Sequence, residues 1–143
     1  MSEQDALIEY HGGCHCKAIR FTVNAPTKLV CFDCNCSICA MKKNCHFIVP
    51  KESFSIQDGG ESRLTEYRFG TEVARHMFCS ICGVQSFYFP RSNPDGVAVT
   101  IHCLDKASRE KADILVEWFD GENWDHFYQT SDIAKYSANK GRK

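Results

Sequence analysis

The stretch Phe78-Cys79-Ser80-Ile81-Cys82-Gly83 places two cysteines three positions apart and follows them with a glycine. Two residues between cysteines allow a tight turn that presents both sulfurs to one ion, with zinc–sulfur bonds of about 2.3 Å. Gly83 can adopt a positive φ, so the chain can turn back there without a Cβ clash. The stretch has the form of a zinc knuckle, and a knuckle needs a second pair of ligands.

Cys14-His15-Cys16 is the candidate for that second pair. Residues i and i+2 of an extended chain face the same way at a spacing of about 6.6 Å, so a bend at His15 is needed to bring the two sulfurs together. Because neighbouring side chains alternate, we expect His15 itself to point away from the site. A zinc site formed by these two cysteines with Cys79 and Cys82 would join distant parts of the chain, which is a structural role.

A third group of cysteines lies within six residues, in Cys34-Asn35-Cys36-Ser37-Ile38-Cys39. In one interpretation Cys34, Cys36 and Cys39 hold an ion and leave its fourth position open for water or substrate, as catalytic zinc sites do. In the other, Cys31 closes the site, because Cys31-Phe32-Asp33-Cys34 is itself a pair of cysteines separated by two residues. The open site is our preferred interpretation, and the closed site remains an alternative.

The ten cysteines of this 143-residue chain are also compatible with a disulfide framework. Three features favour zinc: the clustered spacing, a length above that of disulfide-stapled mini-domains, and an acidic start that lacks the basic and apolar regions of a secretory signal. No apolar run reaches the roughly 18 residues that a membrane span needs. We therefore expect no membrane association and a cytoplasmic location, with the nucleus as the alternative.

The net charge gives no sign of nucleic-acid binding. It is −1 with every cysteine counted as neutral, and seven thiolates binding two divalent zinc ions would add seven negative and four positive charges, giving −4. Nucleic-acid binding needs concentrated lysine and arginine. The one basic cluster is at the tail: Lys135, Lys140, Arg142 and Lys143.

The rest of the chain reads as short extended segments separated by turn residues. Apolar side chains alternate at Ile19, Phe21 and Val23, and again from Val97 to Cys103. The predicted strands are Leu7–His11, Ala18–Asn24, His46–Val49, Arg63–Phe69, Ala74–Phe78, Val84–Phe89, Val97–Cys103 and Ile114–Phe119. A helix is predicted from about Asn123 to Tyr136, and a short one within 105–113, capped by Asp105. We expect a mainly β, single domain spanning residues 1–143, with its cysteine clusters on turns.

Three ordered motifs carry a family resemblance. Gly13-Cys14-His15-Cys16, then the cluster from Cys34 to Cys39, then Phe78 to Gly83 resemble the glutathione-dependent formaldehyde-activating enzyme family over about residues 10–128. The chain looks most similar to the animal centromere protein V branch of that family. The segments that carry this closer likeness include His46-Phe47-Ile48-Val49-Pro50, Arg91-Ser92-Asn93-Pro94 and His102-Cys103-Leu104-Asp105.

The resemblance implies a zinc-bearing β-tent fold like that of methionine sulfoxide reductase B. It implies two zinc ions per chain: a structural one on Cys14, Cys16, Cys79 and Cys82, and a second one on Cys34, Cys36 and Cys39, with Cys31 outside the motif. The implied activity is that of a carbon–sulfur lyase acting on a glutathione–aldehyde adduct such as S-hydroxymethylglutathione.

Such a reaction needs a proton donor and groups that hold carboxylates. The histidines that could serve as the donor are His46, His76 and His102, of which we prefer His46 and His102. Glutathione carries two carboxylates, which arginine or lysine can bind. The candidates are Lys42, Lys43, Arg75 and Arg91, with Lys42, Lys43 and Arg91 preferred.

Two rival functions follow from the same residues. A non-catalytic β-module stabilised by zinc could bind a protein partner through aromatic side chains near the C-terminus: Trp118, Phe119, Trp124, Phe127 and Tyr128. Redox sensing would instead use the cysteines outside the clusters, which are Cys31, Cys45 and Cys103. Self-association is left open by the sequence.

Overall fold

A computed structural model describes residues 6–137 and confirms a mainly β fold with a C-terminal helix. The acidic start up to Asp5 and the tail residues Lys140, Arg142 and Lys143 lie outside the described part. One antiparallel sheet has the order β1-β2-β5, formed by Leu7–Gly13, Arg20–Pro26 and Phe54–Ile56. A second has the order β10-β3-β4-β9-β8, formed by Asp113–Phe119, Lys28–Cys34, Cys45–Pro50, Gly96–Thr100 and Phe87–Tyr88. β6 (Leu64–Tyr67) pairs with β7 (His76–Cys79).

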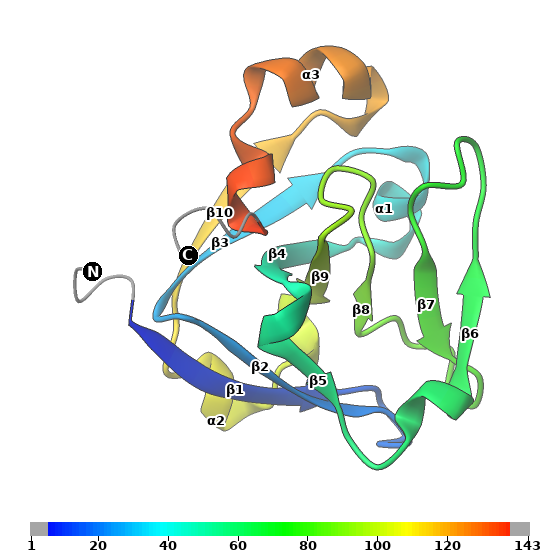
Figure 1. Cartoon of the computed structure of the whole chain (residues 1–143), viewed down its shortest axis with the longest axis vertical. Coiled ribbons are helices and arrows are strands. Elements are labelled where there is room, and N and C mark those ends of the chain that lie inside the picture. Colours follow the sequence, from blue (N-terminus) through cyan, green and yellow to red (C-terminus); the bar gives the residue numbers. More distant parts are fainter. Residues whose placement is uncertain (1–5, 138–143) are drawn as a thin grey trace.

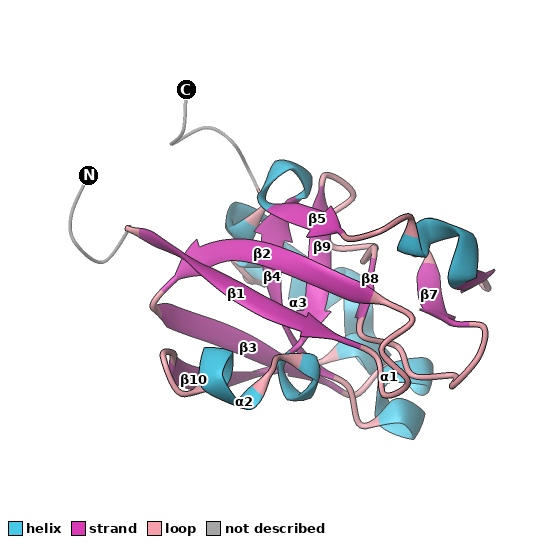
Figure 2. Cartoon of the chain, turned by 90° about the horizontal axis from the view of Figure 1, so that it is seen from below, coloured by secondary structure: helices cyan, strands magenta, loops and turns pink. Residues whose placement is uncertain are grey.

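The three-stranded sheet packs across one face of the five-stranded sheet, as Figures 1 and 2 show. The two-residue alternation of a strand assigns side chains to the two faces. Phe47 and Val49 of β4 face the three-stranded sheet, whereas Ile48 between them faces the other way. Val97 and Val99 of β9 pack with that first core, together with Ile19, Phe21 and Val23 as their spacing predicts.

A second, smaller core covers the opposite face of the five-stranded sheet. Its buried members include Phe32, Ile48, Tyr88, Ala98, Phe119 and Ile133. Part of its cover comes from α3 (Trp124–Thr130) and a 3-10 turn at Ile133–Tyr136, both of which follow β10. In Figure 1, α3 stands beyond the end of β10, and the 3-10 turn comes back beside the sheet. This second face, and not the large core, borders the site described below.

The helix predicted from about Asn123 to Tyr136 is divided in two. α3 ends at Thr130, because Ser131 adopts an extended conformation with ψ 155°. The chain then forms the separate 3-10 turn, in which Ile133 is buried and the Tyr136 ring meets Phe32 edge-on at 5.4 Å. The break allows the segment to fold back onto the sheet, which one straight helix could not do.

Several elements differ from the sequence-based expectation. β3 and β5 were not predicted, nor was α1 (Ser37–Lys42), which begins inside the second cysteine cluster. β9 ends at Thr100, and Ile101–Cys103 forms a 3-10 turn. Cys103 therefore does not extend the alternating strand, and it is only partly buried.

The short helix near 105–113 is α2, which spans Lys106–Arg109. Asp105 occupies the position before it, but its side chain makes no capping hydrogen bond. The carboxylate instead accepts two hydrogen bonds from the guanidinium of Arg20, at 3.0 and 2.5 Å. Asp105 therefore ties β2 to the segment that precedes α2. Over residues 6–137, no helix has the length and apolar character that crossing a membrane requires.

Candidate metal centres

The first cysteine group brings together two parts of the chain that are far apart in the sequence, as the knuckle motif predicts. The Sγ atoms of Cys14, Cys16, Cys79 and Cys82 all lie within 4.8 Å of one another. Cys14 follows β1, Cys79 ends β7, and the other two sit in the turns after them. His15 between the first pair is exposed and lies outside the group. Four sulfurs at this spacing are the donor set of a closed structural zinc site.

Backbone N–H groups point at the sulfurs of this group. The amide of Ile19 donates to Cys14 Sγ at 3.3 Å, and the amides of Ile81 and Cys82 donate to Cys79 Sγ at 3.4 and 3.5 Å. Hydrogen bonds to the charged form of a group favour that form, so these amides stabilise thiolates. Gly83 has φ +77°, the positive value that its place after the second cysteine predicts.

The second group consists of three sulfurs from one continuous segment. Cys34 ends β3, Cys36 caps the start of α1, and Cys39 lies in the first turn of that helix, with their Sγ atoms within 4.8 Å of one another. The Cys36 sulfur accepts the amide of Cys39 at 3.4 Å. Hydrogen bonds from the Cys34 and Cys39 thiols hold the pKa of Cys36 well below its usual value. Three thiolates form a donor set that suits zinc and leaves one of its four positions to another ligand.

Cys31 does not belong to this second group. Positions 31 and 34 of a strand point to opposite faces, and Cys31 is buried in the large core while Cys34 faces the smaller one. Burial is the main reason why the pKa of Cys31 is raised to about 12, with smaller contributions from Cys45. The alternation within β3 thus separates Cys31 from the cluster that its sequence spacing suggested.

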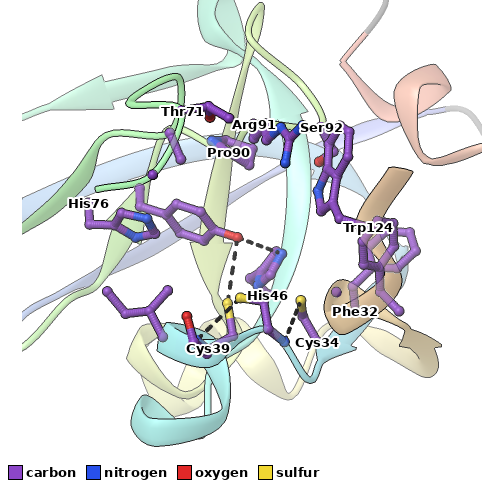
Figure 3. A pocket seen from close by; sticks show the side chains of 18 of the residues that line it. Phe32, Cys34, Cys39, His46, Thr71, His76, Pro90, Arg91, Ser92 and Trp124 are labelled. Atoms are coloured by element: carbon purple, nitrogen blue, oxygen red, sulfur yellow. Dashed lines mark hydrogen bonds between the residues drawn. The ribbon is translucent and has the colours of Figure 1, made fainter. Parts of the chain in front are cut away.

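A cavity of about 270 Å³ lies beside the second group, and all three of its cysteines line it (Figure 3). Phe32, Phe119 and Trp124 line it, as do Phe69, His76 and Tyr88. Its one cationic side chain, among the described residues, is Arg91. The Arg91 guanidinium stacks 3.7 Å from the centre of the Trp124 ring and donates to Asp125 at 3.2 Å.

Two histidines of the cavity are buried and electrically neutral. Burial lowers the pKa of His46 to about 4 and also lowers the pKa of His76. In both rings the Nδ1 atom is buried without a hydrogen-bond partner. Buried polar atoms nearly always have a partner, so each of these two nitrogens retains the capacity for one further hydrogen bond.

The structure separates the preferred site residues into two places. His46 and Arg91 line the cavity beside the second cysteine group. His102, Lys42 and Lys43 line a different depression, together with Cys103 and Gln85, whose side-chain oxygen accepts a hydrogen bond from the Lys42 ammonium. Of the other candidates considered, His76 lines the first cavity, whereas Arg75 is paired with Glu66.

Tyr88 and Gly121 are among the residues of the cavity that the sequence analysis did not predict. The signal for Tyr88 was available, since alternation with the core residue Phe87 places it on the opposite face. Gly121 lies against the second group: a Cβ there would be 2.6 Å from Cys36 Cβ and 2.7 Å from Cys34 Sγ. The Asn35 side chain holds this turn by bonding Asp120 and the amide of Glu122, each at 3.1 Å.

The chain is similar to known proteins both in fold and in sequence. The crystal structure of a Rhodobacter sphaeroides protein is similar, with a TM-score of 0.62 and 27% sequence identity over 77% of this chain and 100% of that chain. The family profile described as "glutathione-dependent formaldehyde-activating enzyme" matches residues 9–120. The match covers well over half of the chain and includes both cysteine groups. The chain therefore belongs to the glutathione-dependent formaldehyde-activating enzyme family.

Proposed function

We propose that this protein is a carbon–sulfur lyase that forms and cleaves the adduct of glutathione, or a closely related thiol, with formaldehyde. In this proposal Cys14, Cys16, Cys79 and Cys82 hold a structural zinc, and Cys34, Cys36 and Cys39 hold a second one. We place the protein in the cytoplasm, where thiols are kept reduced. The closer likeness to the centromere protein V branch stays a prediction.

The observation that carries this proposal is the position of the three-sulfur group on the wall of a cavity. A group of four sulfurs satisfies a tetrahedral ion, whereas a group of three leaves one position for an incoming ligand. Zinc bound at the three sulfurs would stabilise the thiolate form of a substrate thiol over the thiol. The side chains around that position must then supply binding and orientation.

Arg91 is the residue of this cavity that suits a carboxylate of glutathione. Its guanidinium carbon already lies 3.7 Å from the centre of the Trp124 ring, which supports the group, and its partner Asp125 has a largely exposed side chain. An exposed ion pair is worth little, so a substrate carboxylate can replace Asp125 at small cost. The second carboxylate of glutathione has no described cationic partner inside the cavity, so we expect it to face solvent.

The aromatic lining is suited to holding a small aldehyde away from water. Phe32, Phe69 and Phe119 offer no hydrogen bonds to bulk solvent, and both histidines are neutral near pH 7 because of their burial. A site of low polarity strengthens the electrostatic interactions of the few polar groups in it. Those groups are the cysteine sulfurs, the two histidines, the Tyr88 hydroxyl, Ser92 and Arg91, together with other polar atoms at the rim.

The test is the rate of adduct exchange above the uncatalysed background. Glutathione and formaldehyde combine unaided, so exchange NMR should measure formation and cleavage rates at several protein concentrations. Native mass spectrometry should show two zinc ions per chain and a one-to-one glutathione complex. We expect a catalytic rate proportional to protein concentration.

Cys36→Ser is the decisive variant, and Cys103→Ser is its matched control outside both groups. The first should retain its fold and lose glutathione binding, exchange activity and one zinc, whereas the second should keep all three. Glutathione binding that survives in folded Cys36→Ser would contradict the proposal.

A second candidate function is a non-catalytic module that binds a protein partner. The observation that favours it is the apolar character of β10, an outer strand of its sheet on which Leu115, Val116 and Trp118 are exposed. An exposed apolar edge strand is a template with which another chain can pair, and exposed apolar patches mark sites of interaction. Two zinc ions with no glutathione complex at millimolar glutathione would favour this function over the lyase.

A further inference from the structure

We propose that the hydroxyl of Tyr88 holds the aldehyde oxygen during the reaction, and that His46 behind it orients that hydroxyl. The inference rests on the proposed function, because it assigns a role within the same cavity. Neither residue needs to bind zinc for this role. The argument depends on where the hydroxyl lies, on what already bonds to it, and on what holds the ring.

The Tyr88 hydroxyl lies between the second cysteine group and His46. Its oxygen is 3.3 Å from His46 Nε2 and 4.0 Å from Cys39 Sγ, and the bonds that reach these two residues are drawn in Figure 3. The strand order explains how the three meet. β9 separates β8 from β4, and Ala98 of β9 pairs with Tyr88 in the sheet register. Because the alanine side chain is only a methyl group, the phenol ring can extend over β9 towards His46.

Both contacts of this hydroxyl are long. A hydroxyl hydrogen bond is normally near 2.7–2.8 Å, roughly 0.5 Å shorter than its contact with His46. The contact with Cys39 is at the outer limit for a bond to sulfur. Tyr88 is buried and lines the cavity, and buried hydroxyls nearly always have a close partner. The hydroxyl therefore retains capacity for an acceptor that arrives with the substrate.

The direction of the ring is set by two histidines. The His76 ring stacks on Tyr88 with centres 5.1 Å apart and planes 11° apart, and the His46 ring meets it edge-on at the same separation. Phe69 in turn stacks on His76, with ring centres 5.5 Å apart. A donor held in place before the reaction stabilises developing charge without reorganising, which is the principle of an oxyanion hole.

The chemistry needs a donor at this place. In adduct formation the thiolate sulfur gives an electron pair to the carbonyl carbon, the carbon–sulfur bond forms, and the π pair of the carbonyl moves to oxygen. That oxygen takes the phenol proton, and the proton that the thiol released on ionising returns to the phenol. Atoms and charge balance without a co-reactant, and cleavage follows the same path in reverse.

The experiment compares Tyr88→Phe with Tyr10→Phe in the zinc-loaded protein. Tyr10 is a matched control because it is also buried, and its hydroxyl bonds the Pro26 carbonyl at 2.8 Å, away from the cavity. Loss of one oxyanion donor typically lowers kcat by about 10²-fold or more. We expect that loss in Tyr88→Phe, with zinc content and glutathione affinity unchanged, whereas Tyr10→Phe should keep the wild-type kcat.

His46→Gln tests the positioning role. If His46 acts through Tyr88, this change should lower kcat in the wild-type background and have no further effect in the Tyr88→Phe background. Equal losses in the two backgrounds would overturn the role of His46.

The remaining outcomes distinguish the two proposals. A Tyr88→Phe protein with a kcat like that of Tyr10→Phe would overturn this inference while leaving the lyase function in place. Loss of zinc or of glutathione affinity in Tyr88→Phe would overturn it too, since the hydroxyl would then serve Cys39 and not the aldehyde. A wild-type protein that does not accelerate exchange would overturn the proposed function, and this inference with it.

Discussion

The two cysteine groups use the same ligand atoms but are built in opposite ways. The first brings together residues that are 63 positions apart, such as Cys16 and Cys79, whereas the second comes from the six-residue segment Cys34–Cys39. Cys16 in the first group is exposed, and the second group lines a cavity. A group whose ligands are far apart in the sequence ties different elements of the fold together. A group from one short segment does not link distant elements, and its ion can bind a further ligand.

The difference has an energetic basis. A metal bound by residues that are far apart in sequence binds poorly to the unfolded chain, so most of its binding free energy becomes folding free energy. A metal bound by three residues of one short segment depends less on the rest of the fold. The first group should therefore govern stability, and the second should govern chemistry.

Cys79→Ser is the strongest test of this division. The change removes one of four ligands from the group that joins β1 to β7, and the lost metal binding should exceed the whole stability of the domain, which is about 5–15 kcal/mol for typical proteins. We expect an unfolded or aggregated product by circular dichroism, in contrast to folded Cys36→Ser. A folded Cys79→Ser protein with an unchanged melting temperature would refute the division.

Gly121→Ala should disturb the second group while leaving all of its cysteines unsubstituted. The added Cβ would lie 2.6 Å from Cys36 Cβ and 2.7 Å from Cys34 Sγ, so the turn or the cluster must move. Such overpacking costs about 1–3 kcal/mol. We expect loss of one zinc by native mass spectrometry and of exchange activity, with the first zinc retained. Retention of both zinc ions and full activity would show that the cluster tolerates displacement.

Gly83→Ala is the corresponding change at the first group. Nothing lies within 4 Å of a Cβ at Gly83, but its φ of +77° is unfavourable for alanine. The cost should be about 1–2 kcal/mol, measured by urea unfolding, with both zinc ions kept. Gly83→Asn is the control, because asparagine accepts this conformation more readily and should cost less. Equal losses for alanine and asparagine would contradict the backbone explanation.

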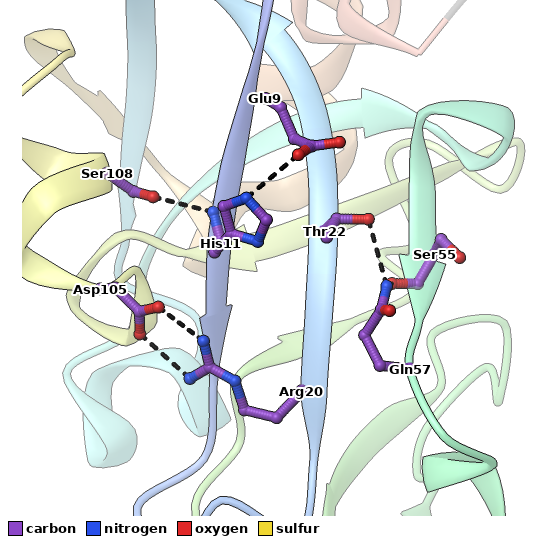
Figure 4. Close-up of polar contacts among 8 residues, drawn as sticks. All are labelled: Glu9, His11, Arg20, Thr22, Ser55, Gln57, Asp105 and Ser108. Carbon is purple, nitrogen blue, oxygen red and sulfur yellow. Dashed lines mark hydrogen bonds and ion pairs between the residues drawn. The ribbon is translucent and has the colours of Figure 1, made fainter.

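The smallest effect should come from Asp105, whose ion pair with Arg20 lies near the first group (Figure 4). The hydrogen bond from Arg20 is the main cause that lowers the pKa of Asp105. The folded state therefore favours the carboxylate, and its stabilisation is present above the ordinary aspartate pKa of about 3.9 and is lost as pH falls through the lowered value. Because the pair is partly exposed, Asp105→Asn should cost less than about 1 kcal/mol at pH 7.

The measurement for Asp105→Asn is the difference in unfolding free energy from the wild type at pH 7, in low salt and in high salt. Both conditions leave the zinc-binding thiolates ionised. We expect the difference to shrink in high salt, because salt screens a partly exposed ion pair. A difference that does not change with salt would mean that the carboxylate charge makes no contribution.

Much of the fold follows from local patterns, and the misses have a common cause. The alternation at Ile19, Phe21 and Val23 predicted their place in the large core, because strand geometry alone determines which side chains share a face. β3 was missed because Cys31 and Cys34 have the spacing of metal ligands, which suggested a metal-binding turn where the chain forms a strand. The expected C-terminal helix is divided because burying Ile133 on the sheet stabilises the chain more than continuing the helix past Thr130 would.

The sequence by itself determined the seven cysteines that are candidates for the two groups, because short spacings and turn residues act within a few positions of the chain. It left Cys31 open as a fourth member of the second group, which the alternation within β3 excludes. It did not determine that His46 lines the cavity while His102 lines another depression, or that Tyr88 and Gly121 border the second group. Those neighbours come from β4, β8 and the turn after β10, and they meet only through the strand order of the five-stranded sheet. Strand order depends on long-range packing, so only the tertiary structure decided what surrounds the three sulfurs.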